Sequence, residues 1–162
     1  MSERPWYIVN VRDVQWYDAD TSGFYADFQR GEPFPELGVN FGMALPGQIA
    51  ALYHRESHQE CYFVLAGEGI LIVEGEERPL KRWDYFHCPP GVDHICVAAG
   101  DGPFVVIAVG GRVGKKEIVY PVNETAARYG ASVQVETTDP REAYASFSRP
   151  EPVPFREEFL AG

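Results

Sequence analysis

Two histidines and two glutamates, His54, Glu56, His58 and Glu60, fall within seven residues and share one parity. Alternate residues of a β-strand face the same side, so all four side chains would line one face if the strand ran unbroken. Imidazole nitrogens and carboxylate oxygens are suitable ligands for Zn, Fe(II), Mn(II) or Ni(II). A solvated hairpin face rich in His and Glu has the same pattern. This stretch alone therefore leaves a metal site and a polar surface both open.

A second stretch, WDYFHCPPGVDHICV at residues 83–97, strengthens the metal interpretation. Its Pro89 and Gly91 predict a sharp turn that places His94 at the start of the next β run. Such a turn fixes the register of a hairpin, and a fixed register allows a distant side chain to meet a site on a neighbouring strand. This turn therefore allows His94 to meet a site on a neighbouring strand and favours the metal interpretation of residues 54–60.

These two stretches resemble the two motifs of the cupin superfamily. The first motif of the family has a glycine, a His-x-His pair, a glutamate three or four residues later and another glycine. The corresponding residues of this chain are Gly47, His54, Glu56, Glu60 and Gly67. The second motif, Gly-x5-Pro-x-Gly-x-x-His-x3-Asn, corresponds here to Trp83, Pro89, Gly91, His94 and Ala98. The chain thus departs from the family at Glu56, Trp83 and Ala98.

The resemblance covers about residues 38 to 110 and implies a small antiparallel β-barrel of the jelly-roll type with a metal in its mouth. Carried over by position, the implied metal ligands are His54, Glu56, Glu60 and His94, and Glu56 stands where the family has its second histidine. Two imidazoles and two carboxylates form a hard, anionic set, so we expect one divalent transition metal, Fe, Mn, Ni or Zn. A site without metal is the alternative that this departure raises.

Four further residues are candidates for contacts around the metal: His58, His87, Tyr62 and Cys96. His58 could replace Glu56 if the segment bulges, or lie in the second shell or on the surface. His87 could be a hydrogen-bonded wall residue or, if it faces inward, a proton carrier, since the unperturbed pKa of histidine lies near neutrality. Tyr62 could offer its phenol to a substrate or simply pack, and Cys96 could face the cavity or be an inert buried thiol.

The pattern along the chain predicts an all-β fold in a single domain of residues 1–162. Short β runs alternate with Gly and Pro turns, which is typical of antiparallel hairpins closed into a barrel or sandwich. We expect an N-terminal strand at residues 6–11, the barrel core at about 38–110 and a helical extension at about 112–162. In the extension, Asn123 and the capping box at Asp139 predict two short helices, followed by an extended, proline-rich tail. The phenylalanines of that tail could dock on the barrel or on another subunit, or belong to a frayed end.

The composition of the chain disfavours several classes of function. The formal net charge is −10, which disfavours a nucleic-acid partner, and no apolar stretch is long enough to predict a membrane segment. Three cysteines outside any Cys-x-x-Cys motif disfavour a disulfide scaffold, so we expect a reducing, cytoplasmic location. The cupin resemblance suggests a homodimer.

The sequence as a whole predicts a metal-binding cupin that acts on a small oxygenated organic molecule, as an oxygenase or an isomerase. The alternative is a non-catalytic cupin that binds a small molecule as a sensor or carrier, with or without a metal. Because fold does not fix function, the choice between them rests on the site.

Overall fold

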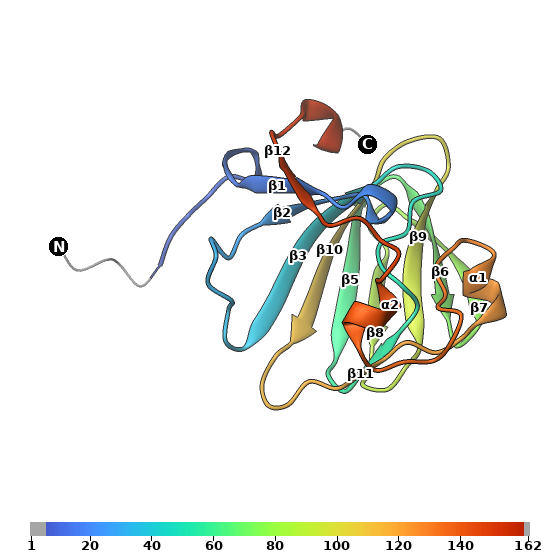
Figure 1. The fold of residues 1–162 in the computed structure, drawn as a ribbon. Helices are drawn as coiled ribbons and strands as arrows, with labels where there is room; N and C mark the ends of the chain where they lie inside the picture. The colour runs from blue at the N-terminus through green and yellow to red at the C-terminus, as the bar shows by residue number, and fades with distance from the viewer. Residues whose placement is uncertain (1–5, 161–162) are drawn as a thin grey trace.

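The computed structural model describes residues 6–160 and shows antiparallel strands in three sheets (Figure 1). In spatial order, the strands of the largest sheet are β12 (Glu151–Val153), β1 (Gln15–Asp18), β2 (Phe24–Asp27), β3 (Leu37–Ala44), β10 (Phe104–Gly111), β5 (Glu60–Ala66) and β8 (Tyr85–Cys88). The second sheet contains β7 (Glu76–Lys81), β6 (Glu68–Val73) and β9 (His94–Ala99). A short pair joins β11 (Ile118–Val119) to β4 (Arg55–Glu56).

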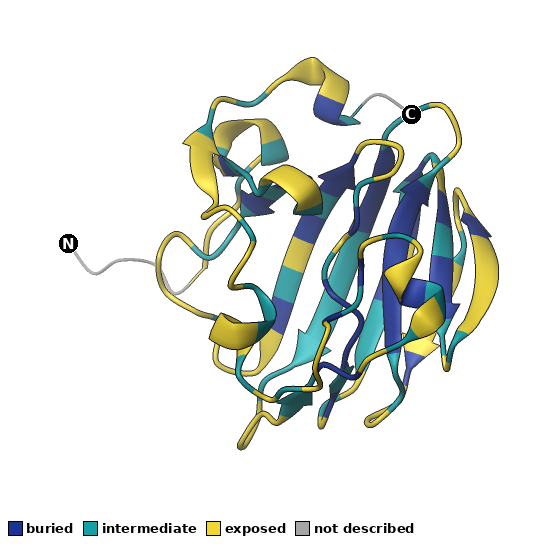
Figure 2. Cartoon of the chain, turned by 45° about the vertical axis from the view of Figure 1, so that its right-hand side comes forward, coloured by how far each residue is buried: buried dark blue, intermediate teal, exposed yellow. Residues whose placement is uncertain are grey.

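The two larger sheets pack on one another through a shared apolar core. Tyr62, Val64 and Phe104 from the largest sheet lie in one buried cluster with Leu71 and Cys96 from the second sheet. The strands with inward apolar residues are the most buried part of the cartoon (Figure 2). The expected antiparallel β fold is confirmed, but within residues 6–160 the hydrogen-bonded ladders do not join into one closed barrel.

Two short helices, α1 (Glu124–Ala127) and α2 (Pro140–Ala143), form where the caps predicted them. The Asn123 side chain accepts a hydrogen bond from the Ala126 amide, and the Asp139 side chain accepts one from the Arg141 amide. The reciprocal half of the capping box does not form, because Glu142 instead accepts from the Thr137 hydroxyl. Three 3-10 helices complete the fold, η1 (Val11–Asp13), η2 (Asp20–Ser22) and η3 (Glu157–Leu160).

The predicted N-terminal strand at residues 6–11 is wrong. Residues 6–10 lie in no strand, and the first strand is β1, which begins at Gln15. The side chain of Asn10 accepts a hydrogen bond from the Arg12 amide and starts η1 at the end of the apolar run. Ile8 is 91% exposed, so this run is not the buried edge of a sheet.

The C-terminal extension packs on the β core of its own chain. Strand β12 pairs with β1, and Phe159 is buried with its ring centroid 4.7 Å from those of Trp16 and Phe24. Earlier in the extension, Tyr120 and Ala126 belong to a buried cluster built on strands β6 and β9. Among the described residues, no helix is long and apolar enough to span a membrane.

Candidate metal centre

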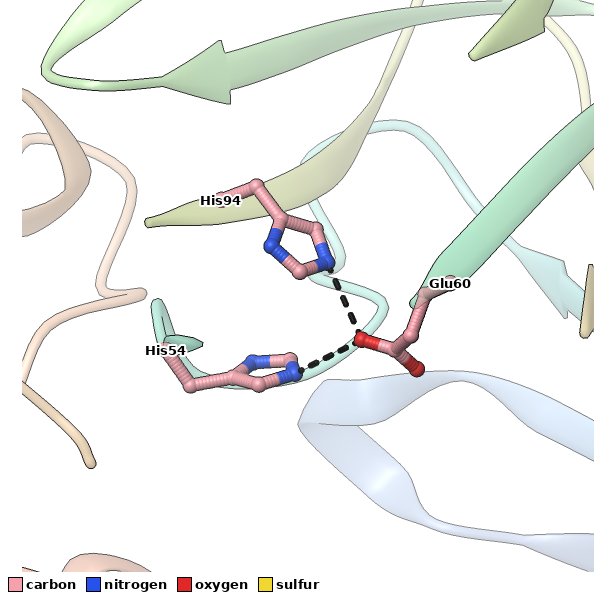
Figure 3. Close-up of side chains that lie close together, drawn as sticks. All are labelled: His54, Glu60 and His94. Atoms are coloured by element: carbon pink, nitrogen blue, oxygen red, sulfur yellow. Dashed lines mark ion pairs between the residues drawn. The ribbon is translucent and has the colours of Figure 1, made fainter. Parts of the chain in front are cut away.

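His54, Glu60 and His94 converge on one point (Figure 3). Glu60 Oε2 lies 3.5 Å from His54 Nε2 and 3.2 Å from His94 Nε2. One potential ligand atom from each residue falls within 4.8 Å of the others, and both histidines are buried. The structure thus brings together three of the four ligands that the sequence predicted.

Backbone pairing between distant segments creates this convergence. His54 and His94 form an isolated antiparallel bridge, with the His94 amide donating to the His54 carbonyl at 2.8 Å. The Pro-Gly turn is tied to the same segment, because the Gly91 amide donates to the Glu56 carbonyl at 2.8 Å. Glu60 begins β5 opposite Gly110 of β10, where an added Cβ would come within 3.2 Å of Glu60 Oε1. A glycine at this position therefore leaves room for the carboxylate.

Both imidazoles are oriented by backbone carbonyls. His54 Nδ1 lies 2.7 Å from the Leu52 carbonyl, and His94 Nδ1 lies 2.9 Å from the Val92 carbonyl. An N–H at Nδ1 satisfies each carbonyl, so Nε2 is the nitrogen of each ring that faces Glu60. A fixed tautomer of this kind is what histidine ligands of metals generally need.

The charge arrangement at this point fits a cation. Glu60 Oε2 is buried and finds no hydrogen-bond partner within residues 6–160, although two imidazole nitrogens lie nearby. Burial opposes ionisation of Glu60, but the contacts with His54 and His94 outweigh it and lower the pKa of the carboxyl to about 2. Burial likewise opposes a charged His94, yet Cys88 and Glu60 raise its pKa to about 9. The carboxylate thus draws positive charge to this point, and a divalent ion would supply it.

Glu56, the fourth predicted ligand, is buried, and its carboxylate lies closer to Lys116 than to His54. Its Oε1 lies 3.8 Å from His54 Nε2 and only 2.5 Å from Lys116 Nζ. Its Oε2 is buried, with no hydrogen-bond partner in the described part of the chain. The structure therefore leaves its role as a metal ligand a prediction.

A cavity of about 680 Å³ opens beside these residues. His54, Glu56, Glu60 and Tyr62 form part of its polar lining, and strands β3 and β10 provide apolar walls. The segment between α2 and β12 also lines the cavity, through residues that include Tyr144 and Arg149. The extension thus contributes to the wall of the cavity.

Tyr62 and Cys96 face this interior. The Tyr62 hydroxyl lies within hydrogen-bond distance of His94 Nε2, at 2.8 Å, and burial raises the pKa of Tyr62 well above the ordinary value. Cys96 is buried in the cavity lining, where desolvation raises the pKa of its thiol. Cys88 contacts the other side of His94, with Sγ 3.3 Å from Nδ1.

His58 and His87 lie away from the convergence. The segment bends after β4, so the unbroken strand that would have aligned His58 with Glu60 does not form. His58 Nε2 instead donates to the Val113 carbonyl at 2.8 Å. His87, on β8, lies opposite Cys61 of β5 and is exposed, while its chain neighbour Cys88 is buried. An inward-facing proton carrier at His87 is therefore excluded.

Sequence reasoning missed Lys116 and Arg149 as residues of the cavity. Both lie outside the stretch that resembles the cupin motifs, and nothing in their local pattern distinguishes them from surface cations. Only the pairing of β11 with β4 and of β12 with β1 carries their segments to the cavity.

Comparison with known proteins agrees with the motifs and the fold. Residues 42–110 match the family model described as Cupin domain. These residues form a cupin domain. No curated protein matches this cupin in sequence.

Solved structures with a similar fold include several bacterial cupins. A sugar phosphate isomerase from Silicibacter pomeroyi is 18% identical with a TM-score of 0.61, over 69% of this chain and 80% of that one. A putative sugar phosphate isomerase from Acidithiobacillus ferrooxidans is 21% identical with a TM-score of 0.53, over 60% of this chain and 65% of that one. A polyketide cyclase from Streptomyces resistomycificus is 16% identical with a TM-score of 0.53, over 69% and 80%. At these identities the likeness concerns the fold.

Proposed function

We propose that this cupin is a metal-dependent enzyme that acts on a small oxygenated organic molecule, as an isomerase or an oxygenase. The observation that carries the proposal is the convergence of His54, Glu60 and His94, of which His54 and Glu60 line a cavity of about 680 Å³. Two histidines and one carboxylate with open positions are a set used by non-haem Fe(II) oxygenases, and the same donors also suit Mn, Ni or Zn. The sequence predicts Glu56 as a fourth ligand, but in this structure its Oε1 contacts Lys116 Nζ.

The bound metal would polarise a carbonyl or enol as a Lewis acid or, if it is iron, support dioxygen chemistry. The residues of the chain would do the remaining work. His54 and His94, held by backbone carbonyls, present Nε2, and Glu60 supplies the negative charge. The Tyr62 hydroxyl could donate a hydrogen bond to an oxygen of the substrate. The apolar walls of the cavity would exclude water from the reacting atoms.

The substrate class follows from the size and charge of the cavity. A volume of about 680 Å³ suits a small organic molecule. The glutamates partly cancel the charge of a divalent ion, which favours a neutral or singly charged oxygen donor over a polyphosphate. Two of the similar structures are a sugar phosphate isomerase and a putative sugar phosphate isomerase, which supports the isomerase branch, although the likeness to them is one of fold.

Elemental analysis of protein purified without chelator tests the metal. We expect close to one equivalent of a single transition metal, and its loss in His94→Ala and Glu60→Ala. His87→Ala is the matched control, because His87 is exposed on the outer side of β8 and should leave the metal content unchanged. If no metal binds even after reconstitution with Fe(II), Mn(II), Ni(II) and Zn(II), the proposal fails.

A second candidate is a non-catalytic cupin that binds a small molecule as a sensor or carrier. The 680 Å³ cavity supports binding whether or not turnover follows. Oxygen-uptake and isomerisation assays on the metal-loaded protein separate the two candidates. Saturable ligand binding without turnover across several substrate classes would favour the second.

We also propose a cytoplasmic location and a homodimer. Cys61, Cys88 and Cys96 are all free thiols, which supports a reducing compartment. Phe63 and Tyr85 pair across β5 and β8 and are both exposed, which supports an association surface on that sheet. Light scattering on the purified protein measures the mass in solution.

A further inference from the structure

One carboxylate, Glu56, has two competing partners. It is 6% exposed, with Oε1 2.5 Å from Lys116 Nζ and 3.8 Å from His54 Nε2. Its Oε2 has no hydrogen-bond partner among the described residues. A carboxylate this buried needs a counter-charge, and in this structure the ammonium of Lys116 supplies it.

Lys116 does not reach Glu56 by chance, because its loop is tied to the Glu56 segment on both sides. Strand β11 pairs with β4, with Ile118 opposite Glu56. The Ser57 amide donates to the Glu117 carbonyl at 2.9 Å, and the Glu117 amide donates to Ser57 Oγ at 2.9 Å.

His58 fixes the other end of the loop. Its Nε2 donates to the Val113 carbonyl at 2.8 Å, three residues before Lys116. The neighbouring Lys115 shows the contrast, because it is 85% exposed and pairs with the exposed Glu117 at 3.3 Å. The loop thus delivers one specific lysine to the buried carboxylate and leaves its neighbour in solvent.

We propose that Lys116 withholds Glu56 from the metal, so that the ion is held by His54, Glu60 and His94 and keeps open positions for substrate. This inference rests on the proposed function. An ammonium and a metal ion at the same oxygen would repel each other, so Glu56 can serve one of them at a time. Lys116 is then a positioning residue that sets the number of carboxylates on the metal and the charge that the substrate meets.

The test is a Co(II) titration followed by visible absorption, which reports affinity and responds to coordination number. In Lys116→Met the freed carboxylate can bind the ion, so we expect a changed spectrum and roughly tenfold tighter binding, in the range reported for residues behind the ligands. In the Glu56→Gln single variant we expect the wild-type spectrum and affinity. The Lys116→Met/Glu56→Gln double variant should also return to wild-type behaviour.

Lys115→Met is the matched control and should change neither the spectrum nor the affinity, because Lys115 lies in solvent. Circular dichroism checks the fold of each variant. If Lys116→Met does not fold, Lys116→Gln keeps a hydrogen-bond donor but removes the charge, and it carries the same expectation.

Two outcomes overturn the inference while leaving the metal site intact. One is that Lys116→Met or Lys116→Gln folds and binds Co(II) as the wild type does. The other is that Glu56→Gln loses Co(II) as completely as Glu60→Gln, which would make Glu56 a ligand despite Lys116. If the wild-type protein binds no metal at all, the proposed function itself fails, and that result is distinct from the other two.

Discussion

At the residue scale, His94 is surrounded on both ring nitrogens. Val92 and Cys88 contact Nδ1, and the Tyr62 hydroxyl contacts Nε2, the nitrogen that would bind a metal. In the neutral ring that a metal requires, the Nε2 lone pair either accepts a hydrogen bond from this hydroxyl or binds the cation. Tyr62 and the metal therefore compete for the same lone pair.

This competition predicts that Tyr62→Phe binds the metal more tightly. Removing the hydroxyl frees Nε2, and a single hydrogen bond contributes about 1 kcal/mol, which corresponds to an affinity gain of roughly fivefold. Calorimetric titration with Co(II) measures the change. Tyr120→Phe is the control, since its ring lies tilted against that of His54 with the centroids 5.9 Å apart, and no hydrogen bond of its hydroxyl is seen among the described residues. A loss of metal in Tyr62→Phe would instead make the phenol a ligand.

The convergence of His54, Glu60 and His94 could be predicted because the resemblance to two cupin motifs implies which residues meet, whereas their spacing alone left a polar surface open. The same reasoning could not place His58. Its parity suggested the metal face, but the bend after β4 turns it toward the Val113 carbonyl. Lys116 was unpredictable for a related reason, since its partner is set by a loop conformation and not by a periodic pattern.

At the element scale, the backbone conformation at Trp83 shows what one departure from the family motif costs. Trp83 stands where the cupin motif has glycine, and its φ is 76°, in the left-handed region. This conformation costs a residue with a Cβ about 1 to 2 kcal/mol, whereas glycine adopts it freely. In return, the Trp83 indole contacts Arg82 and Phe63, which a glycine at this position would not do.

We therefore predict that Trp83→Gly is more stable than Trp83→Ala by about 1 kcal/mol in urea denaturation. Both variants lose the indole contacts, so their difference isolates the backbone strain. Any effect of the missing ring on association also cancels between them. Equal stabilities would show that the left-handed conformation costs little here.

Elements whose ends carry a local signal were predicted well. Asn123 and Asp139 mark the starts of α1 and α2 because their side chains accept hydrogen bonds from the first-turn amides. The apolar run at residues 6–11 has the composition of a strand, but nothing in its local sequence specifies a strand with which it would pair. Whether a run pairs is decided by distant segments, and here β1 takes its partners from β2 and β12.

At the scale of the whole molecule, the candidate metal centre joins separate sheets. Glu60 begins a strand of the largest sheet, His94 begins a strand of the second, and His54 lies next to β4. A metal bound by all three would link the two faces of the sandwich. Because such a site exists only when the sheets are packed, metal binding must stabilise the folded chain.

The expected result is a rise in Tm on adding metal to the metal-free protein. At a free metal concentration of about 100 times Kd, linkage contributes about 2.7 kcal/mol. For a chain of this length that corresponds to roughly 5 to 10 °C. Differential scanning fluorimetry measures the shift, and chelator should reverse it. Glu60→Gln should show no rise, because it removes the ligand that the largest sheet contributes. An equal rise in Glu60→Gln would place the stabilising ion elsewhere on the acidic surface, and the link between the sheets would then be wrong.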